Sequence, residues 1–117
     1  MSVHVSQPVK PVTNGSGAAT EYSETIEGRL LAVIYTKVDF ADGVDFTITD
    51  EITGADLYTA SDQNSAAVKY PRLLAQGGTG SNLTGWYVEP PVAARIKVVI
   101  AQGGSGKTGE FRFVYER

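Results

Sequence analysis

The stretch "RIKVVIAQGGSGKTGEFRFVYE" (residues 95–116) decides the fold, because it places two alternating segments around a glycine-rich centre. One face of each segment is apolar at every second position: Ile96, Val98 and Ile100 in the first, and Phe111, Phe113 and Tyr115 in the second. Alternation of this kind is typical of half-buried β-strands. We therefore predict strands over 95–101 and 110–116, joined by a glycine-rich hairpin.

The centre of this stretch also matches two nucleotide-binding patterns. Residues 101–108 fit a loose P-loop rule, and residues 104–109 fit G-x-G-x-x-G. A phosphate-binding loop needs a following helix whose N-terminus faces the phosphates. The residues after the glycines instead alternate as a strand, so we interpret the loop as a turn. We accordingly expect no nucleotide binding, and no nucleotide hydrolysis through Lys107.

The remaining sequence extends the β pattern. Residues 44–50 alternate apolar and polar side chains, and Gly54 turns the chain back through Leu57. Residues 29–38 are more continuously apolar, as in a strand covered on both faces. Residues 61–70 begin with a possible helix cap but run into a proline, which favours a loop or a single turn. Turn residues recur at short intervals, which predicts an all-β fold: an antiparallel, jelly-roll-like β-sandwich or barrel.

Two regions are expected along the chain. Residues 1–17 contain prolines and glycines among valines, which predicts an extended N-terminal arm, disordered or docked on a partner. Residues 18–117 are expected to form a single β-sandwich domain. The arm residues Val3, Val5 and Val9 are candidate partner contacts, because an apolar-dotted arm can add a strand to the exposed sheet edge of a neighbouring molecule.

Composition excludes several classes of protein. The 117 residues include 10 basic and 13 acidic side chains, a net charge of −3, without the basic stripe of a nucleic-acid-binding protein. The sequence has no cysteine, which excludes disulfides and thiolate chemistry. It shows neither a basic amphipathic segment for a membrane surface nor a secretory signal, so we expect a soluble intracellular product or one released by a route other than a signal peptide.

The candidates for chemistry are few. His4 is the only histidine, and in an arm it lacks the fixed surroundings that a general base requires. Asp39, Asp42 and Asp45 form an acidic loop over 39–45 that has the oxygen ligands for calcium but not the EF-hand spacing. We therefore predict no catalytic, cofactor-binding or metal-binding residues and do not expect an enzyme.

Aromatic residues offer contact surfaces instead. Trp86 and Tyr87 lie in "GWYVEPP", and Tyr70 and Arg72 lie in "YPR". Trp, Tyr and Arg are enriched where proteins touch a partner. These four residues are candidate partner contacts, and the aromatic pair could also stack on a sugar ring, as in a carbohydrate-binding module.

Four segments, taken in order, resemble small virion proteins of tailed bacteriophages. They are "GSGAATEYSETIEGRLLAVIY", "DFTITDEITGADLYT", "YPR" and "RIKVVIAQGGSGKTGEFRFVYE". The resemblance spans residues 14–116 and implies an all-β protein most like a head decoration (cement) protein, located on the outer capsid surface after synthesis in the host cytoplasm. It implies the major capsid protein and copies of the chain itself as partners, with a trimer as the expected oligomer. A head–tail joining (neck) or tail component is the alternative, and a carbohydrate-binding β-sandwich is the alternative of another class.

Overall fold

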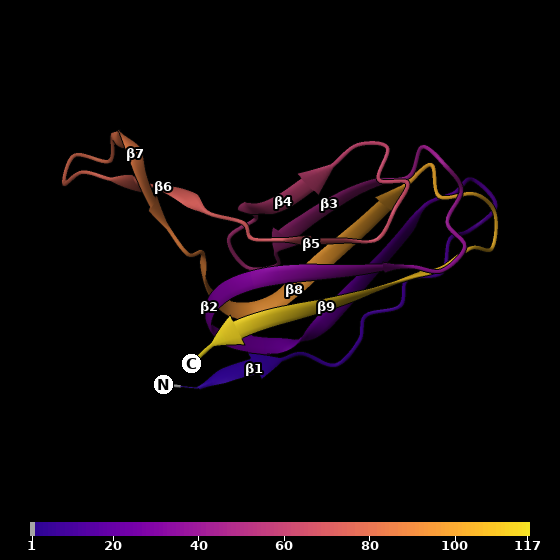
Figure 1. Cartoon of the computed structure of the whole chain (residues 1–117), viewed down its shortest axis with the longest axis horizontal. Helices are drawn as coiled ribbons and strands as arrows, with labels where there is room; N and C mark the ends of the chain where they lie inside the picture. Colours follow the sequence, from indigo (N-terminus) through magenta and orange to yellow (C-terminus); the bar gives the residue numbers. More distant parts are fainter. Residues whose placement is uncertain (1) are drawn as a thin grey trace.

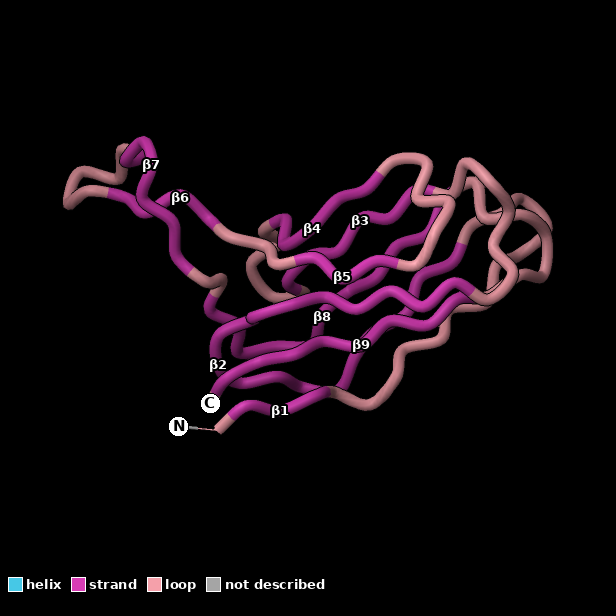
Figure 2. The backbone as a smooth tube through the Cα atoms, in the orientation of Figure 1, coloured by secondary structure: helices cyan, strands magenta, loops and turns pink. Residues whose placement is uncertain are grey.

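The computed structural model describes residues 2–117, which form nine strands and, within that range, no helix (Figures 1 and 2). The strands are β1 (Val3–Val5), β2 (Ala19–Lys37), β3 (Asp45–Asp50), β4 (Asp56–Ala60), β5 (Ala67–Lys69), β6 (Leu73–Gln76), β7 (Asn82–Val88), β8 (Pro91–Ala101) and β9 (Gly109–Glu116). All strand pairs are antiparallel, which confirms the predicted all-β class. Residues 61–70 contain β5 rather than a helical turn.

The long strand β2 organises the sheet. Its first half, from Ala19 to Arg29, pairs with β8, and its second half, from Arg29 to Lys37, pairs with β9. The resulting strand order is β1-β9-β2-β8-β3-β4, with β5 added to the second half of β2. Because β2 changes partners midway, the seven strands form two layers joined through one backbone.

Aromatic contacts show that the two layers face each other. Two strands separate β9 from β3 in the sheet order, yet the ring centroids of Phe111 and Phe46 lie 4.8 Å apart. Tyr35 of β2 packs against both rings, at 5.1 and 4.6 Å. The inward faces of β8 and β9 are the ones that alternation predicted, and their apolar side chains are buried. The core therefore lies between the layers of a β-sandwich.

The partner change in β2 occurs at a crowded glycine. Gly28 has a φ of +148°, and a Cβ added there would lie 2.1 Å from the backbone oxygen of Glu116. The side chain of Arg29, one residue further on, is paired with that of Glu116. Only glycine allows the end of β9 to approach β2 this closely.

The segment between β8 and β9 corrects one prediction. These two strands are not paired with each other, because β8 lies between β2 and β3 while β9 lies between β1 and β2. Residues 102–108 therefore cross from one layer to the other and do not close a hairpin. Two glycines here allow close packing: a Cβ at Gly103 would lie 2.9 Å from Thr13 Cγ2, and one at Gly109, the first residue of β9, would lie 2.5 Å from the ring of Phe40.

The N-terminal arm is extended as predicted, but it lies along β9 of its own chain. Val3–Val5 pair with residues 114–116, and the backbone of Val9 exchanges two hydrogen bonds of 2.8 Å with Phe111. Further along, the Thr13 hydroxyl accepts a hydrogen bond from the Lys107 amide at 2.9 Å. Val9 is only 3% exposed and belongs to the core, so its side chain is not available to a partner. Val3 and Val5 remain exposed.

This packing predicts unequal effects of two substitutions in the arm. Val9→Asp should lower the free energy of unfolding by about 3 kcal/mol or more, because it places a carboxylate in an apolar core. Val3→Asp should change it by less than about 0.5 kcal/mol, because Val3 is 63% exposed. Urea titration followed by circular dichroism measures both. Equal, small effects would show that the arm is free in solution.

Candidate interaction site: the projecting hairpin

Strands β6 and β7 form a separate two-stranded sheet that projects from one end of the sandwich (Figure 1). We call residues 73–88 the projecting hairpin. Its tip is closed by hydrogen bonds from the Gly77 amide to the Ser81 carbonyl and from the Gly80 amide to the Gly77 carbonyl, both 2.9 Å. Each of its two strands pairs only with the other. A lone two-stranded hairpin is marginally stable in water, so this element depends on its attachment or on a partner.

The pairing of the hairpin is interrupted on the β7 side. Leu74 pairs with Tyr87 and Gln76 pairs with Asn82, so Ala75 alone faces residues 83–86. Gly85 adopts a φ of +82° within this bulge. A bulge re-aims side chains, and every residue of β7 is exposed.

The hairpin exposes several large apolar side chains. Trp86 is 70% exposed and Tyr87 63% exposed, and both were predicted as contact residues from the sequence. Leu74, Leu83 and Val88 are exposed beside them. Trp and Tyr offer a large contact area with little loss of side-chain freedom on binding, so the surface is suited to recognition.

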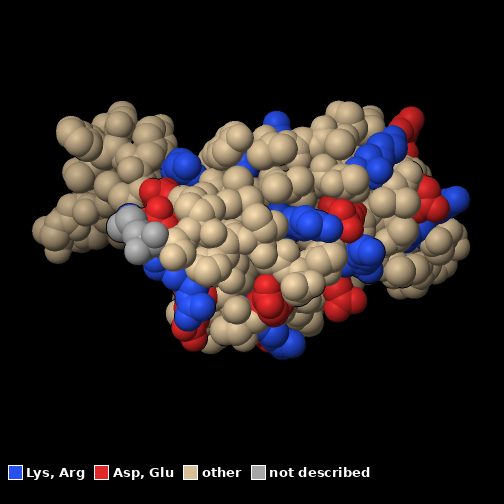
Figure 3. All heavy atoms as spheres, turned by 60° about the horizontal axis from the view of Figure 1, so that its bottom comes forward, with Lys and Arg blue, Asp and Glu red and all other residues tan. Residues whose placement is uncertain are grey.

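The projecting hairpin carries no charge. All 10 basic and 13 acidic residues lie outside residues 73–88. In Figure 3, charged side chains are scattered over the sandwich, whereas the lobe at the left is free of them. Charged side chains keep most protein surfaces solvated, so an exposed apolar element without them favours a contact with another molecule.

Both legs of the hairpin are anchored at one point on β2. The guanidinium of Arg72 donates hydrogen bonds to the carbonyls of Leu31, at 3.1 Å, and Pro71, at 2.7 Å. On the other leg, the carbonyl of Pro90 accepts a hydrogen bond of 2.8 Å from the Leu30 amide. The register of β2 against β9 shifts between residues 30 and 32, which frees the Leu31 carbonyl for Arg72. Arg72, a predicted partner contact, therefore supports the hairpin from within the chain.

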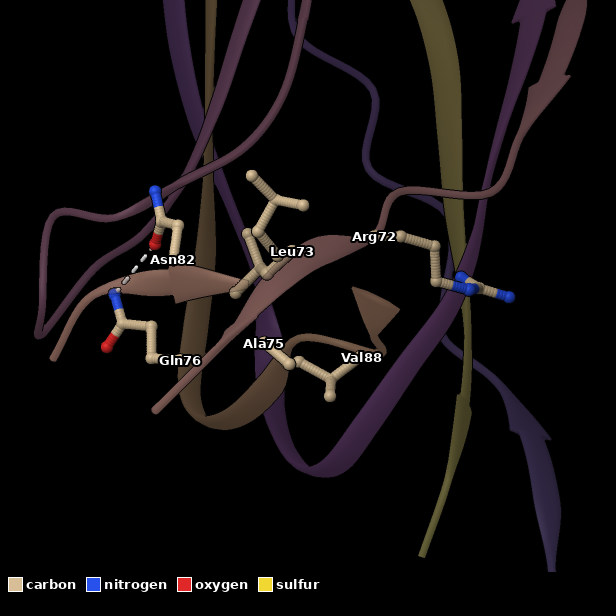
Figure 4. A pocket seen from close by; sticks show the side chains of 7 residues that line it. Arg72, Leu73, Ala75, Gln76, Asn82 and Val88 are labelled. Carbon is tan, nitrogen blue, oxygen red and sulfur yellow. Dashed lines mark hydrogen bonds between the residues drawn. The ribbon is translucent and has the colours of Figure 1, made fainter. Parts of the chain in front are cut away.

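A shallow hollow lies on the β6 side of this attachment (Figure 4). It has a volume of about 730 Å³ and is lined by residues 72–76 together with Asn82 and Val88. The Gln76 amide donates a hydrogen bond of 3.3 Å to the Asn82 side chain across the strand pair. The lining combines apolar side chains with two amides and with Arg72, whose guanidinium is bonded to the Leu31 and Pro71 carbonyls.

The other predicted residues are placed elsewhere. Tyr70 lies 66% exposed just before the hairpin. His4 stacks on Tyr115 at 5.3 Å, at the edge formed by β1. Among residues 2–117, no three His, Cys, Asp or Glu side chains are grouped to hold a metal ion.

The acidic loop over residues 39–45 has structural contacts. Asp39 accepts a hydrogen bond of 2.7 Å from the Thr108 amide, and Asp45 accepts one of 3.0 Å from the Asp62 amide. Asp42 is paired with Lys37 at 3.4 Å. Each carboxylate therefore stabilises a different loop or strand end, through its own hydrogen bond or ion pair.

The clearest electrostatic pair lies on the sandwich. Arg95 donates two hydrogen bonds to the carboxylate of Glu51 and stacks over the ring of Tyr22 at 4.3 Å. These hydrogen bonds lower the pKa of Glu51 and raise the pKa of Arg95. Both groups are exposed, so the pair marks a charged outer face and not a reactive centre.

The sequence pointed to Trp86 and Tyr87 but not to the element that carries them. Leu74, Leu83 and Val88 were not singled out, and neither was the hairpin itself. One feature of the sequence could have indicated the hairpin: the residues between Arg72 and Glu89 include no charged side chain.

Comparison with known proteins adds no identity. None of the residues that the structure describes forms a helix long and apolar enough to cross a membrane. No protein-family model matches the chain, and neither does any curated protein or solved structure.

Proposed function

We propose that this chain is a structural protein of a tailed-bacteriophage virion, a decoration (cement) protein that binds the major capsid protein on the outer surface of the head. The observation that carries the proposal is the projecting hairpin, an uncharged and exposed element held away from a compact sandwich. Exposed apolar surface of this kind marks protein contacts. The role is binding, with no catalytic step.

Two further features support a structural role. The resemblance to small virion proteins spans residues 14–116, and the segments that carry it lie in the sandwich and in the leg before the hairpin. The arm is hydrogen-bonded to β9 and to the loop after β8, so the chain is fastened along its length without disulfides. Such a body can hold its shape while the hairpin makes contacts.

The copy number of the chain in purified virions tests this function. We expect about one copy per capsid subunit if trimers occupy the three-fold positions of the shell, or about one per three if single copies occupy them. Quantitative mass spectrometry against the major capsid protein gives the ratio. A few copies per particle would indicate a neck or tail position, and absence from virions would contradict the proposal.

The exposure of Trp86 and Tyr87 favours one function of another class, carbohydrate binding. Adjacent exposed aromatics can stack on the apolar face of a sugar ring. This alternative predicts binding to a glycan array by the isolated protein, tested with and without calcium, and loss of binding in Trp86→Ala. Wild-type protein that binds no glycan in either condition would eliminate it.

A further inference from the structure

We propose that Asn14 is a site of spontaneous covalent modification, and that the turn over residues 14–18 promotes the reaction. The side-chain amide of Asn14 is lost through attack by the backbone nitrogen of Gly15, which leaves an aspartate or an isoaspartate between the N-terminal arm and β2. This inference goes beyond the proposed virion role and does not depend on it, because the reaction needs only the folded chain and water.

The sequence around Asn14 allows the following residue to attack the side chain. Asn14 is followed directly by Gly15, which has no Cβ to shield its backbone nitrogen. The other two asparagines of the chain, Asn64 and Asn82, precede a serine and a leucine, whose side chains crowd the same approach. Both Asn14 and Gly15 are exposed, so water reaches the site.

The hydrogen bonds of the turn hold the side-chain oxygen of Asn14 and leave its nitrogen free. Oδ1 accepts hydrogen bonds from the Ser16 amide at 3.0 Å, the Ser16 hydroxyl at 2.8 Å and the Ala18 amide at 3.1 Å. Two backbone donors on one atom identify it as the oxygen, because the amide nitrogen cannot accept. Within residues 2–117, no hydrogen bond involves Asn14 Nδ2 or the Gly15 amide. The leaving group and the nucleophile therefore have no hydrogen bond to break.

These contacts favour closure of a five-membered ring. The Gly15 nitrogen forms a bond to Asn14 Cγ, and negative charge develops on Oδ1, where the donors of Ser16 and Ala18 lie. The Cγ–Nδ2 bond then breaks, and ammonia leaves with the proton that the Gly15 nitrogen gives up. Water opens the resulting cyclic imide at either of its two carbonyls. The net reaction consumes one water, releases one ammonia and replaces the amide with a carboxylate.

The two products differ in their effect on the arm. Aspartate leaves the main chain unchanged and still offers an oxygen to the donors of Ser16 and Ala18. Isoaspartate adds one carbon to the main chain directly after Thr13, whose amide and hydroxyl donate hydrogen bonds to the carbonyls of Lys107 and Gly104. We therefore expect the isoaspartate form to hold the arm less firmly against the segment between β8 and β9. Faster hydrogen exchange of the Thr13 amide after modification measures this weakening.

Incubation of the purified full-length chain at mildly alkaline pH, followed by peptide mass spectrometry, tests the site. Asn14 should lose ammonia about tenfold or more faster than Asn64 and Asn82, which serve as internal controls. Gly15→Ala should slow the reaction at Asn14 about tenfold, because the added methyl group crowds the attacking nitrogen. The same methyl group meets no atom within 4 Å, so the turn itself is undisturbed. Equal rates at the three asparagines, or an unaffected rate in Gly15→Ala, would overturn the inference.

A second variant separates the effect of the folded turn from that of the Asn-Gly sequence. Ser16→Ala removes one donor to Asn14 Oδ1 and should slow the reaction about threefold or more in the native chain. In concentrated guanidinium chloride, where the turn is unfolded, Ser16→Ala and the wild type should react at the same rate. A native Ser16→Ala chain that reacts as fast as the wild type, or faster, would contradict promotion by the turn. These measurements use purified protein, so they are independent of the copy number that tests the virion role.

Discussion

Gly28→Ala is expected to lower the free energy of unfolding by about 4 kcal/mol, of a total that is about 5–15 kcal/mol for a domain of ordinary stability. The added methyl group would lie 2.1 Å from the Glu116 backbone oxygen, a contact that only a backbone shift can relieve. Overpacking of this kind costs about 1–3 kcal/mol. The φ of +148°, which side chains rarely adopt, costs about 1–3 kcal/mol more.

Gly15→Ala provides the matched control, because a Cβ at Gly15 meets no atom within 4 Å. We expect its stability to differ from that of the wild type by less than about 1 kcal/mol. Urea unfolding of the two variants and the wild type measures both differences. If Gly28→Ala were as stable as Gly15→Ala, the close approach of β9 to the middle of β2 would be wrong.

Phe111→Ala should be similarly damaging, with a loss of about 3–5 kcal/mol in the free energy of unfolding. Phe111 is fully buried, and its ring packs against Tyr35 of the neighbouring strand β2 and against Phe46 of the opposite layer. Its removal would open a cavity where the two layers meet. Thermal and urea unfolding measure the loss, and a value below about 1 kcal/mol would contradict the facing layers.

Tyr35→Phe, in the same aromatic cluster, should not lower the free energy of unfolding. Among the described residues, the buried Tyr35 hydroxyl has no hydrogen-bond partner, and burial raises its pKa. Removing an unpaired buried hydroxyl is expected to leave stability unchanged or raise it by about 1 kcal/mol. A clear loss would indicate that the hydroxyl is satisfied by a bound water.

The local β pattern was readable from the sequence because alternation reflects burial on one face. The predicted segments 44–50, 95–101 and 110–116 correspond to β3, β8 and β9, and their apolar faces are the buried ones. The strand after the glycine-rich loop also shows that residues 101–108 lack the helix of a phosphate-binding loop. Alternation reports the environment of each strand, and it does not identify the neighbouring strand.

Pairing partners were therefore the part that the sequence could not supply. Adjacent strands commonly pair as hairpins, but β8 and β9 are separated by β2, whose nineteen residues serve both. The arm was misjudged for a related reason. Its prolines indicated an extended segment, but only the three-dimensional structure shows that Val9 fills a position in the core beside β9.

The projecting hairpin was missed because its residues resemble both strand and loop. Its glycines indicated turns, and the aromatic pair drew attention without indicating a separate sheet. The bulge that exposes Trp86 depends on a pairing mismatch between β6 and β7, which no single residue signals.

The continuous path of β2 has a mechanical consequence. In a sandwich whose layers are linked only by loops, a force on one layer can extend a flexible loop before it reaches the other layer. Here the same backbone runs from one layer into the other at Gly28, and the hairpin is attached two to three residues further on, at Leu30 and Leu31. A force applied at the hairpin therefore reaches β2 through these hydrogen bonds and is then carried by one continuous backbone into both layers.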